Sequence, residues 1–255
     1  MAVTKKTPHR TSNWYQRVVN PARWEAPDRN YRGHRDILTR NLARYHFVKP
    51  LFSGLALEVG CGRGYGLEVI RPKVDAVIGV DVAMDFLQEI APPARIVQAS
   101  GLTLPFKDRQ FDTVVAFEVI EHIQADQAFI EDLRRVARST ACVAISTPNR
   151  LASSGKSTRP LDPYHVREYV AGEFASLLRR SFPRVVLYGQ HDHAPATAAA
   201  NRLLDRVPIR WKYILPAVLQ GWLSARLRQP LRLEDCVFET DRLEHAHTLL
   251  AICHL

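Results

Sequence analysis

The chain has 255 residues, of which 46% are hydrophobic and 24% charged, and a formal net charge of +9. This composition is typical of a globular domain with enough apolar residues to bury a core. No apolar run reaches the roughly 18 residues of a membrane-spanning helix, and the N-terminus lacks the apolar stretch of a signal peptide. The four cysteines are widely spaced. We therefore expect reduced thiols in a cytoplasmic protein and exclude a disulfide scaffold or a zinc finger.

Positive charge is concentrated near the N-terminus. Residues 1–50 contain eleven Lys or Arg and three Asp or Glu, and a second basic stretch lies within residues 201–232. We expect residues 1–40 to form a basic arm. The arm is either a solvated leader or a binding segment for an anionic partner, such as nucleic acid, a phosphorylated sugar carrier or an acidic membrane surface.

From residue 55 onward, short apolar runs alternate with segments of helical periodicity. Helices are predicted at 126–138 and 171–182, where apolar residues recur at spacings of three and four. The apolar runs show no strict polar alternation, so we expect strands that are covered on both faces. These strands lie at 55–60, 76–81, 94–99, 112–118, 141–147, 184–189 and 248–254. The pattern predicts an α/β, doubly wound and mostly parallel sheet of seven strands.

The alternation of strands and helices is interrupted before the last strand. We expect residues 41–190 to form the core, residues 191–245 a mainly helical insertion, and residues 246–255 the last strand. Within the insertion, residues 211–228 have the spacing of an amphipathic helix. Such a helix would pack on the core or cover an acceptor pocket, and its alternative role is at a membrane surface.

The first strand is followed by closely spaced glycines: Gly60, Gly62, Gly64 and Gly66. A dinucleotide fingerprint needs a third glycine five residues after the first. No glycine stands five residues after Gly60, Gly62 or Gly64, so this fingerprint is absent. A phosphate loop ending at residues 155–157 fails as well, because Arg150 stands where it needs a glycine. What remains is a glycine loop with an acid, Asp81, after the second strand. This pattern favours a ligand that has a ribose but no pyrophosphate.

Several motifs occur in order along this core: LEVGCGRGYG, VIGVD, LTLPF, FEVIEHI and ISTPNR. In these the chain resembles the class I S-adenosylmethionine-dependent methyltransferases, of the bacterial small-molecule or glycan-modifying kind with a type 11-like domain. The resemblance covers about residues 41–190 and the last strand. It implies a Rossmann-like methyltransferase fold and S-adenosylmethionine as the cofactor.

The resemblance also implies which residues contact this cofactor. Glu58 would offset its ammonium charge, and Asp81 would accept hydrogen bonds from its ribose while also capping a helix at 83–90. Ser100 stands where the family usually has an acid that binds adenine, which leaves adenine to backbone groups near Gly101 and Leu102. The full set implied is Glu58, Gly60, Cys61, Gly62, Gly64, Asp81, Val82, Ser100, Gly101, Leu102 and Phe117.

Methyl transfer needs a positioned acceptor and a group that removes its proton. His122 is the natural base, because imidazole titrates near neutrality. Glu118, Glu121, His122 and His165 would together be catalytic. We expect them to orient the acceptor without metal, and the alternative is that they ligate a divalent metal that binds vicinal hydroxyls. Similar EVIEH motifs occur in metal-assisted small-RNA 2′-O-methyltransferases and in ubiquinone-pathway O-methyltransferases.

We therefore expect an S-adenosylmethionine-dependent O-methyltransferase that acts on a small hydroxylated acceptor, such as a sugar or a lipid-linked or secondary metabolite. One alternative is an RNA or nucleotide methyltransferase that uses the basic arm and a metal-assisted 2′-O transfer. Another is a noncatalytic protein that binds the cofactor, since a fold alone does not prove activity.

Overall fold

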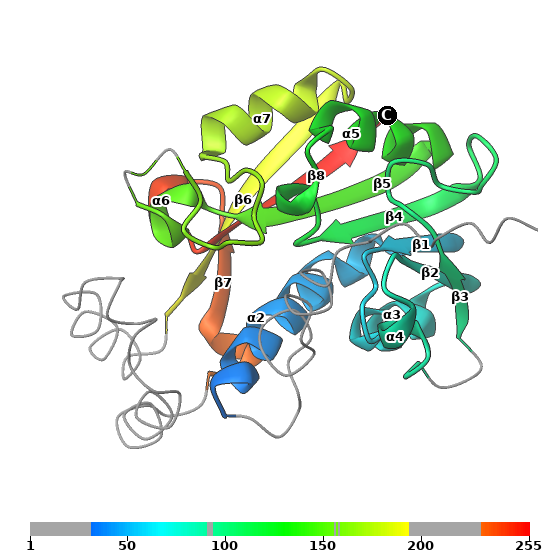
Figure 1. Ribbon diagram of the computed structural model, residues 1–255, viewed down its shortest axis with the longest axis horizontal. Helices are drawn as coiled ribbons and strands as arrows, with labels where there is room; N and C mark the ends of the chain where they lie inside the picture. Colours follow the sequence, from blue (N-terminus) through cyan, green and yellow to red (C-terminus); the bar gives the residue numbers. More distant parts are fainter. Residues whose placement is uncertain (1–31, 91–93, 156, 158, 194–230) are drawn as a thin grey trace, which may run out of the picture.

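The computed structural model describes residues 32–90, 94–155, 157, 159–193 and 231–255 (Figure 1). The strands are β1 (Leu55–Val59), β2 (Ala76–Asp81), β3 (Arg95–Gln98), β4 (Phe111–Phe117), β5 (Ala137–Pro148), β6 (Arg184–Asp192), β7 (Cys236–Glu239) and β8 (Thr248–His254). The α-helices are α2 (Arg32–Val48), α3 (Tyr65–Ile70), α4 (Met84–Leu87), α5 (Asp126–Val136), α6 (Arg150–Ser153) and α7 (Ala171–Arg179). Short 3-10 helices are η1 (Lys49–Leu51), η2 (Arg71–Lys73), η3 (Ile120–His122), η4 (Leu233–Asp235) and η5 (Leu243–His245). In this part of the chain, no helix is long and apolar enough to cross a membrane.

The strands form one sheet in the order β3-β2-β1-β4-β5-β8-β6-β7. The pairs from β3 to β5 are parallel, whereas β8 runs antiparallel to β5 and β6, and β7 runs antiparallel to β6. This confirms the predicted α/β, doubly wound and mostly parallel fold. The chain moves outward from β1 to β3 on one side and from β4 to β5 on the other. Ligands of such sheets bind at this reversal point, outside the carboxyl ends of the strands.

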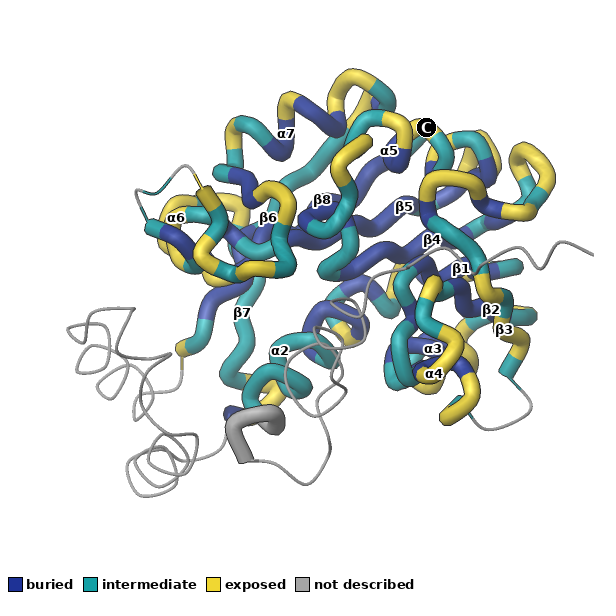
Figure 2. Tube along the Cα trace, in the orientation of Figure 1, coloured by how far each residue is buried: buried dark blue, intermediate teal, exposed yellow. Residues whose placement is uncertain are grey.

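Helices cover both faces of the sheet, with α5 and α7 on one face and α2, α3 and α4 on the other (Figures 1 and 2). Strand β4 shows how the residues divide between the two layers. Val114 and Ala116 pack in one hydrophobic cluster together with residues of α5 and α7, and Val115 and Phe117 pack in the other together with residues of α2 and α3. Because both sides of the strand are buried here, its last four residues, 114–117, are all apolar.

The structure differs from the expected sheet in one strand. The sheet has eight strands where we expected seven, because β7 forms at the edge beside β6 within the segment assigned to the helical insertion. Four residues are too few to show a strand period. The pairing of β7 is supported by tertiary packing, since the Phe238 ring stacks on Phe47 of α2 at 4.3 Å between centroids.

Two further expectations concern the ends of the predicted segments. Helix α2 runs across the boundary predicted between the basic arm and the core at residues 40 and 41. Most of the arm, residues 1–31, lies outside the described residues, and so does the amphipathic helix predicted within 211–228.

Candidate active site

The glycine loop after β1 exposes backbone without side chains at the reversal point of the sheet. Gly60, Gly62 and Gly64 have φ values of 75°, 50° and 77°, in the left-handed region that favours glycine. A Cβ built on Gly60 would lie 2.3 Å from Val119, whereas a Cβ built on Gly62 would meet no atom within 4 Å. The Cys61 side chain between them is buried. Packing therefore requires the glycine at 60, and the glycine at 62 borders open space that a ligand can fill.

Asp81 ties this loop to the end of β2. Its Oδ2 accepts a hydrogen bond from the Gly62 N–H at 2.8 Å, and its Oδ1 accepts one from the Ala83 N–H at 2.9 Å. The expected helix at 83–90 is shorter, because α4 begins at Met84 and ends at Leu87. Asp81 thus fixes the turn before α4 and the glycine loop together. Each carboxylate oxygen has a second lone pair, which leaves acceptor capacity for a ribose hydroxyl.

The other residues predicted on the adenine side lie after β2 and β3. Val82 and Leu102 are apolar side chains with exposed fractions of 50% and 37%. The Ser100 hydroxyl accepts a hydrogen bond from the Leu102 N–H at 3.2 Å, so it stabilises the turn. A Cβ built on Gly101 would lie 2.8 Å from the Phe129 ring. Gly101 is therefore needed for packing against α5, and adenine binding by these residues stays a prediction.

Glu58 is a buried acid in β1, beneath the glycine loop. The Tyr45 hydroxyl of α2 donates a hydrogen bond to its Oε1, while its Oε2 is buried and has no hydrogen-bond partner among the described residues. Burial raises the pKa of this carboxyl to about 8. A neighbouring cation would stabilise its ionised form. The ammonium group of the cofactor implied by the sequence is such a cation, so the residues present fit that group.

Arg44 of α2 is a candidate site residue that the sequence analysis missed. Its guanidinium is buried and donates hydrogen bonds to Gln190 at 2.9 Å, to Thr248 at 3.4 Å and to Asn41. The nearest carboxylate, Glu118 Oε1, is 3.8 Å away, and the Arg44 Nε atom is buried without a partner among the described residues. A buried cation surrounded mainly by neutral acceptors can bind an anionic group.

Glu118 follows β4 in a conformation that is rare for a residue with a side chain, with a φ of 55°. Its Oε1 accepts a hydrogen bond from the Ser146 hydroxyl of β5 at 2.8 Å. The preceding residue, Phe117, is buried, and its ring meets the Tyr45 ring edge-on at 4.8 Å between centroids. Phe117 therefore packs β4 against α2, and Glu118 lies toward Arg44.

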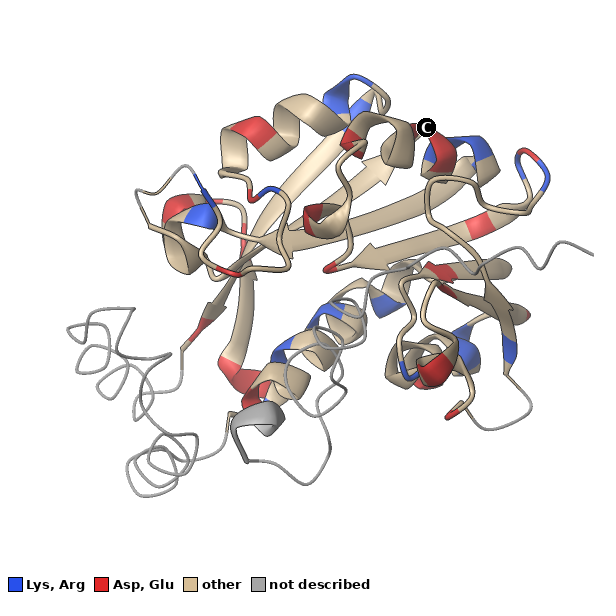
Figure 3. Ribbon diagram, viewed as in Figure 1, with Lys and Arg blue, Asp and Glu red and all other residues tan. Residues whose placement is uncertain are grey.

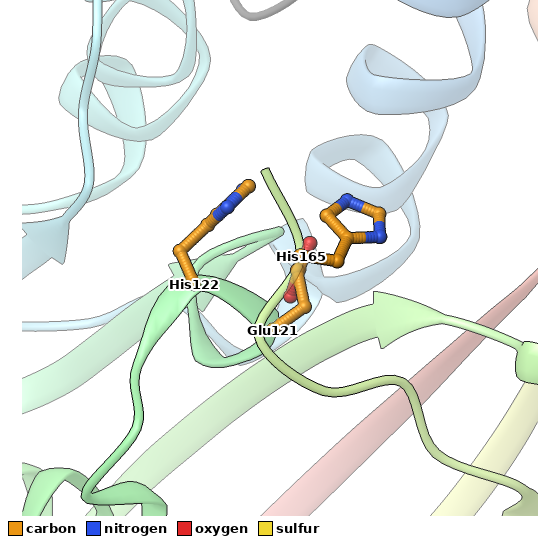
Figure 4. A group of neighbouring side chains, drawn as sticks. All are labelled: Glu121, His122 and His165. Carbon is orange, nitrogen blue, oxygen red and sulfur yellow. The ribbon is translucent and has the colours of Figure 1, made fainter. Parts of the chain in front are cut away.

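The loops that follow β4 and α6 bring three more candidate residues together: Glu121, His122 and His165 (Figure 4). One potential ligand atom from each of the three lies within 4.8 Å of the others. Glu121 and His122 belong to η3, and His165 belongs to the α6–α7 segment. The N–H groups of Val166 and Arg167 donate to the Glu121 carbonyl at 2.7 and 3.2 Å, which docks the segment onto η3. Of the four residues predicted to act together, the structure groups these three and leaves Glu118 outside the group.

Both imidazoles of this cluster are held by a hydrogen bond at Nδ1. His122 Nδ1 lies 3.0 Å from the Tyr164 carbonyl, and His165 Nδ1 lies 2.7 Å from Glu168 Oε1. The two rings are 5.1 Å apart between centroids. Glu168 is a second residue that the sequence analysis missed, although it stands only three positions after His165.

The Glu121 carboxyl is the buried member of the cluster. Its side chain accepts a hydrogen bond from the Thr147 hydroxyl at 3.1 Å. Burial, together with the charge of Glu118, holds the pKa of Glu121 well above its usual range, and His165 opposes this shift. Acidic residues recur on the segment after β4 and on the α6–α7 segment (Figure 3). A cation at this edge would offset their charge.

The fold, the glycine loop and Asp81 are those expected of one family of enzymes, and residues 57–145 match the family described as methyltransferase domain. These residues are therefore similar to the methyltransferase domains of S-adenosylmethionine-dependent enzymes. The cofactor of this family is S-adenosylmethionine. A structure of an S-adenosylmethionine-dependent methyltransferase from Thermotoga maritima shares the fold, with a TM-score of 0.62 and 14% identity, over 95% of this chain and 100% of that one.

Curated relatives match the chain over part of its length. A "Probable S-adenosylmethionine-dependent methyltransferase" of Mycobacterium tuberculosis strain H37Rv is 38% identical over 125 residues, which are 48% of this chain and 46% of the relative. Norajmaline N-methyltransferase of Rauvolfia serpentina is 29% identical over 120 residues, 41% of this chain and 40% of the relative. The mitochondrial ubiquinone biosynthesis O-methyltransferase of Mus musculus is 28% identical over 134 residues, 46% of this chain and 34% of the relative. The chain thus spans about half the length, or less, of these relatives.

Proposed function

We propose that this protein transfers the methyl group of S-adenosylmethionine to a hydroxyl oxygen of a small acceptor, such as a sugar or a lipid-linked or secondary metabolite. The proposal depends on the grouping of Glu121, His122 and His165 at the sheet edge that also carries the glycine loop. Transfer to a hydroxyl requires the oxygen to be held in line with the methyl group and to lose its proton. A carboxylate and two imidazoles are suited to both tasks.

The cofactor, when bound, supplies an electrophilic methyl group on a sulfonium. In this proposal Asp81 accepts hydrogen bonds from its ribose, and the peptide at Gly62 lies against it. The Glu58 carboxylate would pair with the ammonium group of the cofactor, and the Arg44 guanidinium would pair with its carboxylate group. Support for this assignment comes from the buried Oε2 of Glu58 and the buried Nε of Arg44, which have no hydrogen-bond partners within the described part of the chain.

We propose further that the cluster of Glu121, His122 and His165 holds a divalent metal ion. Carboxylate oxygens and imidazole nitrogens are common metal ligands, and histidine ligands are usually oriented by a hydrogen bond at the other ring nitrogen, as both are here. A metal in this position would bind vicinal oxygens of the acceptor and acidify its hydroxyl. If no metal binds, His122 or His165 would serve as the base.

The named relatives include both an N-methyltransferase and an O-methyltransferase, so they do not decide the acceptor atom. The chemistry of the cluster favours oxygen. A neutral amine already presents a lone pair to the methyl group, whereas a hydroxyl near neutral pH must be deprotonated to react well. A buried carboxylate beside two imidazoles would be superfluous for the first reaction and useful for the second.

The same cluster would suit the 2′-hydroxyl of an RNA or nucleotide, which is the second candidate function. The basic residues that motivate this alternative lie mostly outside the described residues. It requires binding to RNA that weakens steeply as salt is raised, because phosphate contacts release counterions. A small neutral acceptor would bind with little dependence on salt.

The proposed function is tested by incubating the protein with labelled S-adenosylmethionine and fractionated cell extract. We expect a product that gains about 14 Da, the mass of one CH2 group, and no such product with Asp81→Ala or His165→Ala. Labelled RNA in the nucleic acid fraction would favour the second candidate. Cofactor binding by calorimetry without transfer to any fraction would favour a noncatalytic binding protein.

A further inference from the structure

We infer that the Glu121–His122–His165 cluster selects a nitrogen-preferring ion of the first transition series, of the Fe²⁺, Co²⁺ or Zn²⁺ class, over Mg²⁺. We infer also that Glu168 is the residue that positions His165 for this ion. The inference rests on the proposed function for its place in the reaction. Its evidence is the donor set and the hydrogen bonds that orient it.

The donor set contains two imidazole nitrogens and one carboxylate. Glu118 lies outside this group of close ligand atoms, and its Oε1 accepts a hydrogen bond from the Ser146 hydroxyl at 2.8 Å and lies 3.8 Å from Arg44. Mg²⁺ prefers oxygen ligands in an octahedral arrangement, whereas imidazole suits iron, nickel, copper and zinc. Two nitrogens and one oxygen therefore favour a transition-metal ion.

The hydrogen bonds determine which ring nitrogen can bind a metal. The Tyr164 carbonyl can only accept, so His122 Nδ1 must donate at 3.0 Å and the lone pair of the neutral ring lies on Nε2. His165 Nδ1 donates to Glu168 Oε1 at 2.7 Å in the same way. Both imidazoles therefore offer Nε2 as the ligand atom.

Glu168 is rigidly held. Its side chain has an exposed fraction of 0%, and its Oε2 accepts a hydrogen bond from the Ser153 hydroxyl of α6 at 2.7 Å. The carboxylate is thus fixed at one oxygen by α6 and at the other by His165. Because a carboxylate fixed in this way keeps the imidazole in one orientation and tautomer, losing it typically weakens metal binding about 10- to 100-fold.

The surroundings of the cluster also favour a cation. Asp162 Oδ2 lies 4.0 Å from His165 Nε2, which is too far for a hydrogen bond but close enough to add negative charge beside the proposed ligand atom. Glu118 and Glu168 border the cluster on other sides, and Arg44 is the nearby cation. Three protein ligands leave coordination positions for oxygens of an acceptor, as catalytic metal sites require.

The test uses the full chain after treatment with a chelator, titrated with Co²⁺ while visible absorption and heat are recorded. We expect one Co²⁺ per chain, with a spectrum typical of nitrogen ligation, and no displacement by a tenfold excess of Mg²⁺. His165→Ala should abolish binding, and Glu168→Gln should weaken it about 10- to 100-fold. The control His193→Ala, which removes a partly exposed histidine outside the cluster, should retain the wild-type affinity. Glu118→Gln removes a neighbouring charge but no proposed ligand, so it should weaken binding less than His165→Ala.

Displacement of Co²⁺ by Mg²⁺ at equal concentration, or a loss with Glu118→Gln as large as that with His165→Ala, would overturn the inference. Thermal unfolding and S-adenosylmethionine binding of each variant separate a lost site from a lost fold. If Glu168→Gln fails to fold, Ser153→Ala removes the other fixed end of Glu168 and should weaken Co²⁺ binding in the same direction. A protein that binds the cofactor and transfers methyl groups without any Co²⁺ uptake would refute this inference and leave the proposed methyl transfer standing.

Discussion

Glu58 is buried in β1, so its carboxyl is costly to ionise in the folded protein. Its pKa is raised to about 8 from an ordinary value of about 4.5, mainly by burial. The folded state thus holds this proton more tightly than the unfolded state does. The contribution of the protonated form to stability is complete below about pH 4.5 and is lost as the pH rises toward 8. We expect Glu58→Gln to become increasingly stable relative to the wild type over this range, by at most about 1.4 kcal/mol per pH unit.

Urea unfolding of both proteins between pH 5 and pH 9 measures this difference. Glu131→Gln is the matched control, because Glu131 is exposed on α5, so its replacement should leave the pH profile unchanged. If the wild type and Glu58→Gln differ by a constant amount across the range, the carboxyl does not titrate between these values. Adding S-adenosylmethionine should reduce the difference above pH 7, where its ammonium group would stabilise the ionised Glu58.

Gly60 and Gly62 have similar backbone conformations but different surroundings, so their alanine variants should behave differently. Both variants place a Cβ in the left-handed region, at a cost of roughly 1 kcal/mol. The Cβ at 60 would also collide with Val119 at 2.3 Å, whereas the Cβ at 62 would enter open space. We expect Gly60→Ala to lower the melting temperature more, and Gly62→Ala to weaken cofactor binding without a comparable loss of stability. Differential scanning calorimetry and binding calorimetry measure the two effects, and equal losses of stability would contradict the prediction.

Residues of the site differ in how much of their role can be predicted from the sequence. Glu121, His122 and His165 could be proposed as a group, because each stands near a strand end in a motif of known chemistry. Arg44 could not, because its partners Gln190 and Thr248 lie 146 and 204 positions away. Burial of a charged residue depends on the tertiary packing around it, which no local pattern records.

At the scale of elements, apolar spacing predicts which helix face is buried. In α5, Phe129, Ile130, Leu133 and Val136 are all fully buried, as their spacing of three and four residues indicates. We expect Leu133→Ala to lower the free energy of unfolding by about 2–5 kcal/mol, since it removes buried carbon and leaves a cavity. Arg134→Ala, on the exposed face, should change it by less than about 0.5 kcal/mol. Chemical denaturation measures both, and similar effects would show that α5 is oriented differently.

Strands differ in how well their own sequences predict them. The central strands β1, β2 and β4 are buried on both faces, so their apolar runs coincide with the observed elements within one or two residues. Strand β7 was not predicted, because its four residues are only half-buried and pair with β6 alone, at the edge of the sheet. For such a strand, pairing and the stacking of Phe238 on Phe47 decide the structure, and both depend on distant parts of the chain.

At the scale of the whole molecule, α2 connects the cofactor side of the sheet with its far edge. Tyr45 contacts Glu58 of β1, and Arg44 contacts Gln190 of β6. Nearer the start of α2, the Arg40 guanidinium donates to Asp192 at the end of β6, at 2.6 and 3.0 Å. The helix therefore joins residues that the sheet keeps several strands apart. We therefore expect a substitution near β6 to alter cofactor affinity through α2.

The pair of Arg40 and Asp192 tests this connection. The Asp192 side chain has an exposed fraction of 2%, and that of Arg40 is 25%, so Arg40→Met would leave a buried carboxylate without its main partner. We expect this variant to lose about 2–3 kcal/mol of unfolding free energy, less than for a fully buried pair, and to bind S-adenosylmethionine several-fold more weakly. Adding Asp192→Asn should restore part of the stability, because it removes the unpaired buried charge.

Arg138→Ala is the control, because it breaks a more exposed ion pair with Asp112. It should lower the free energy of unfolding by less than about 1 kcal/mol and leave cofactor affinity unchanged. If Arg40→Met destabilises the protein but leaves cofactor affinity at the wild-type value, α2 does not couple the two sites.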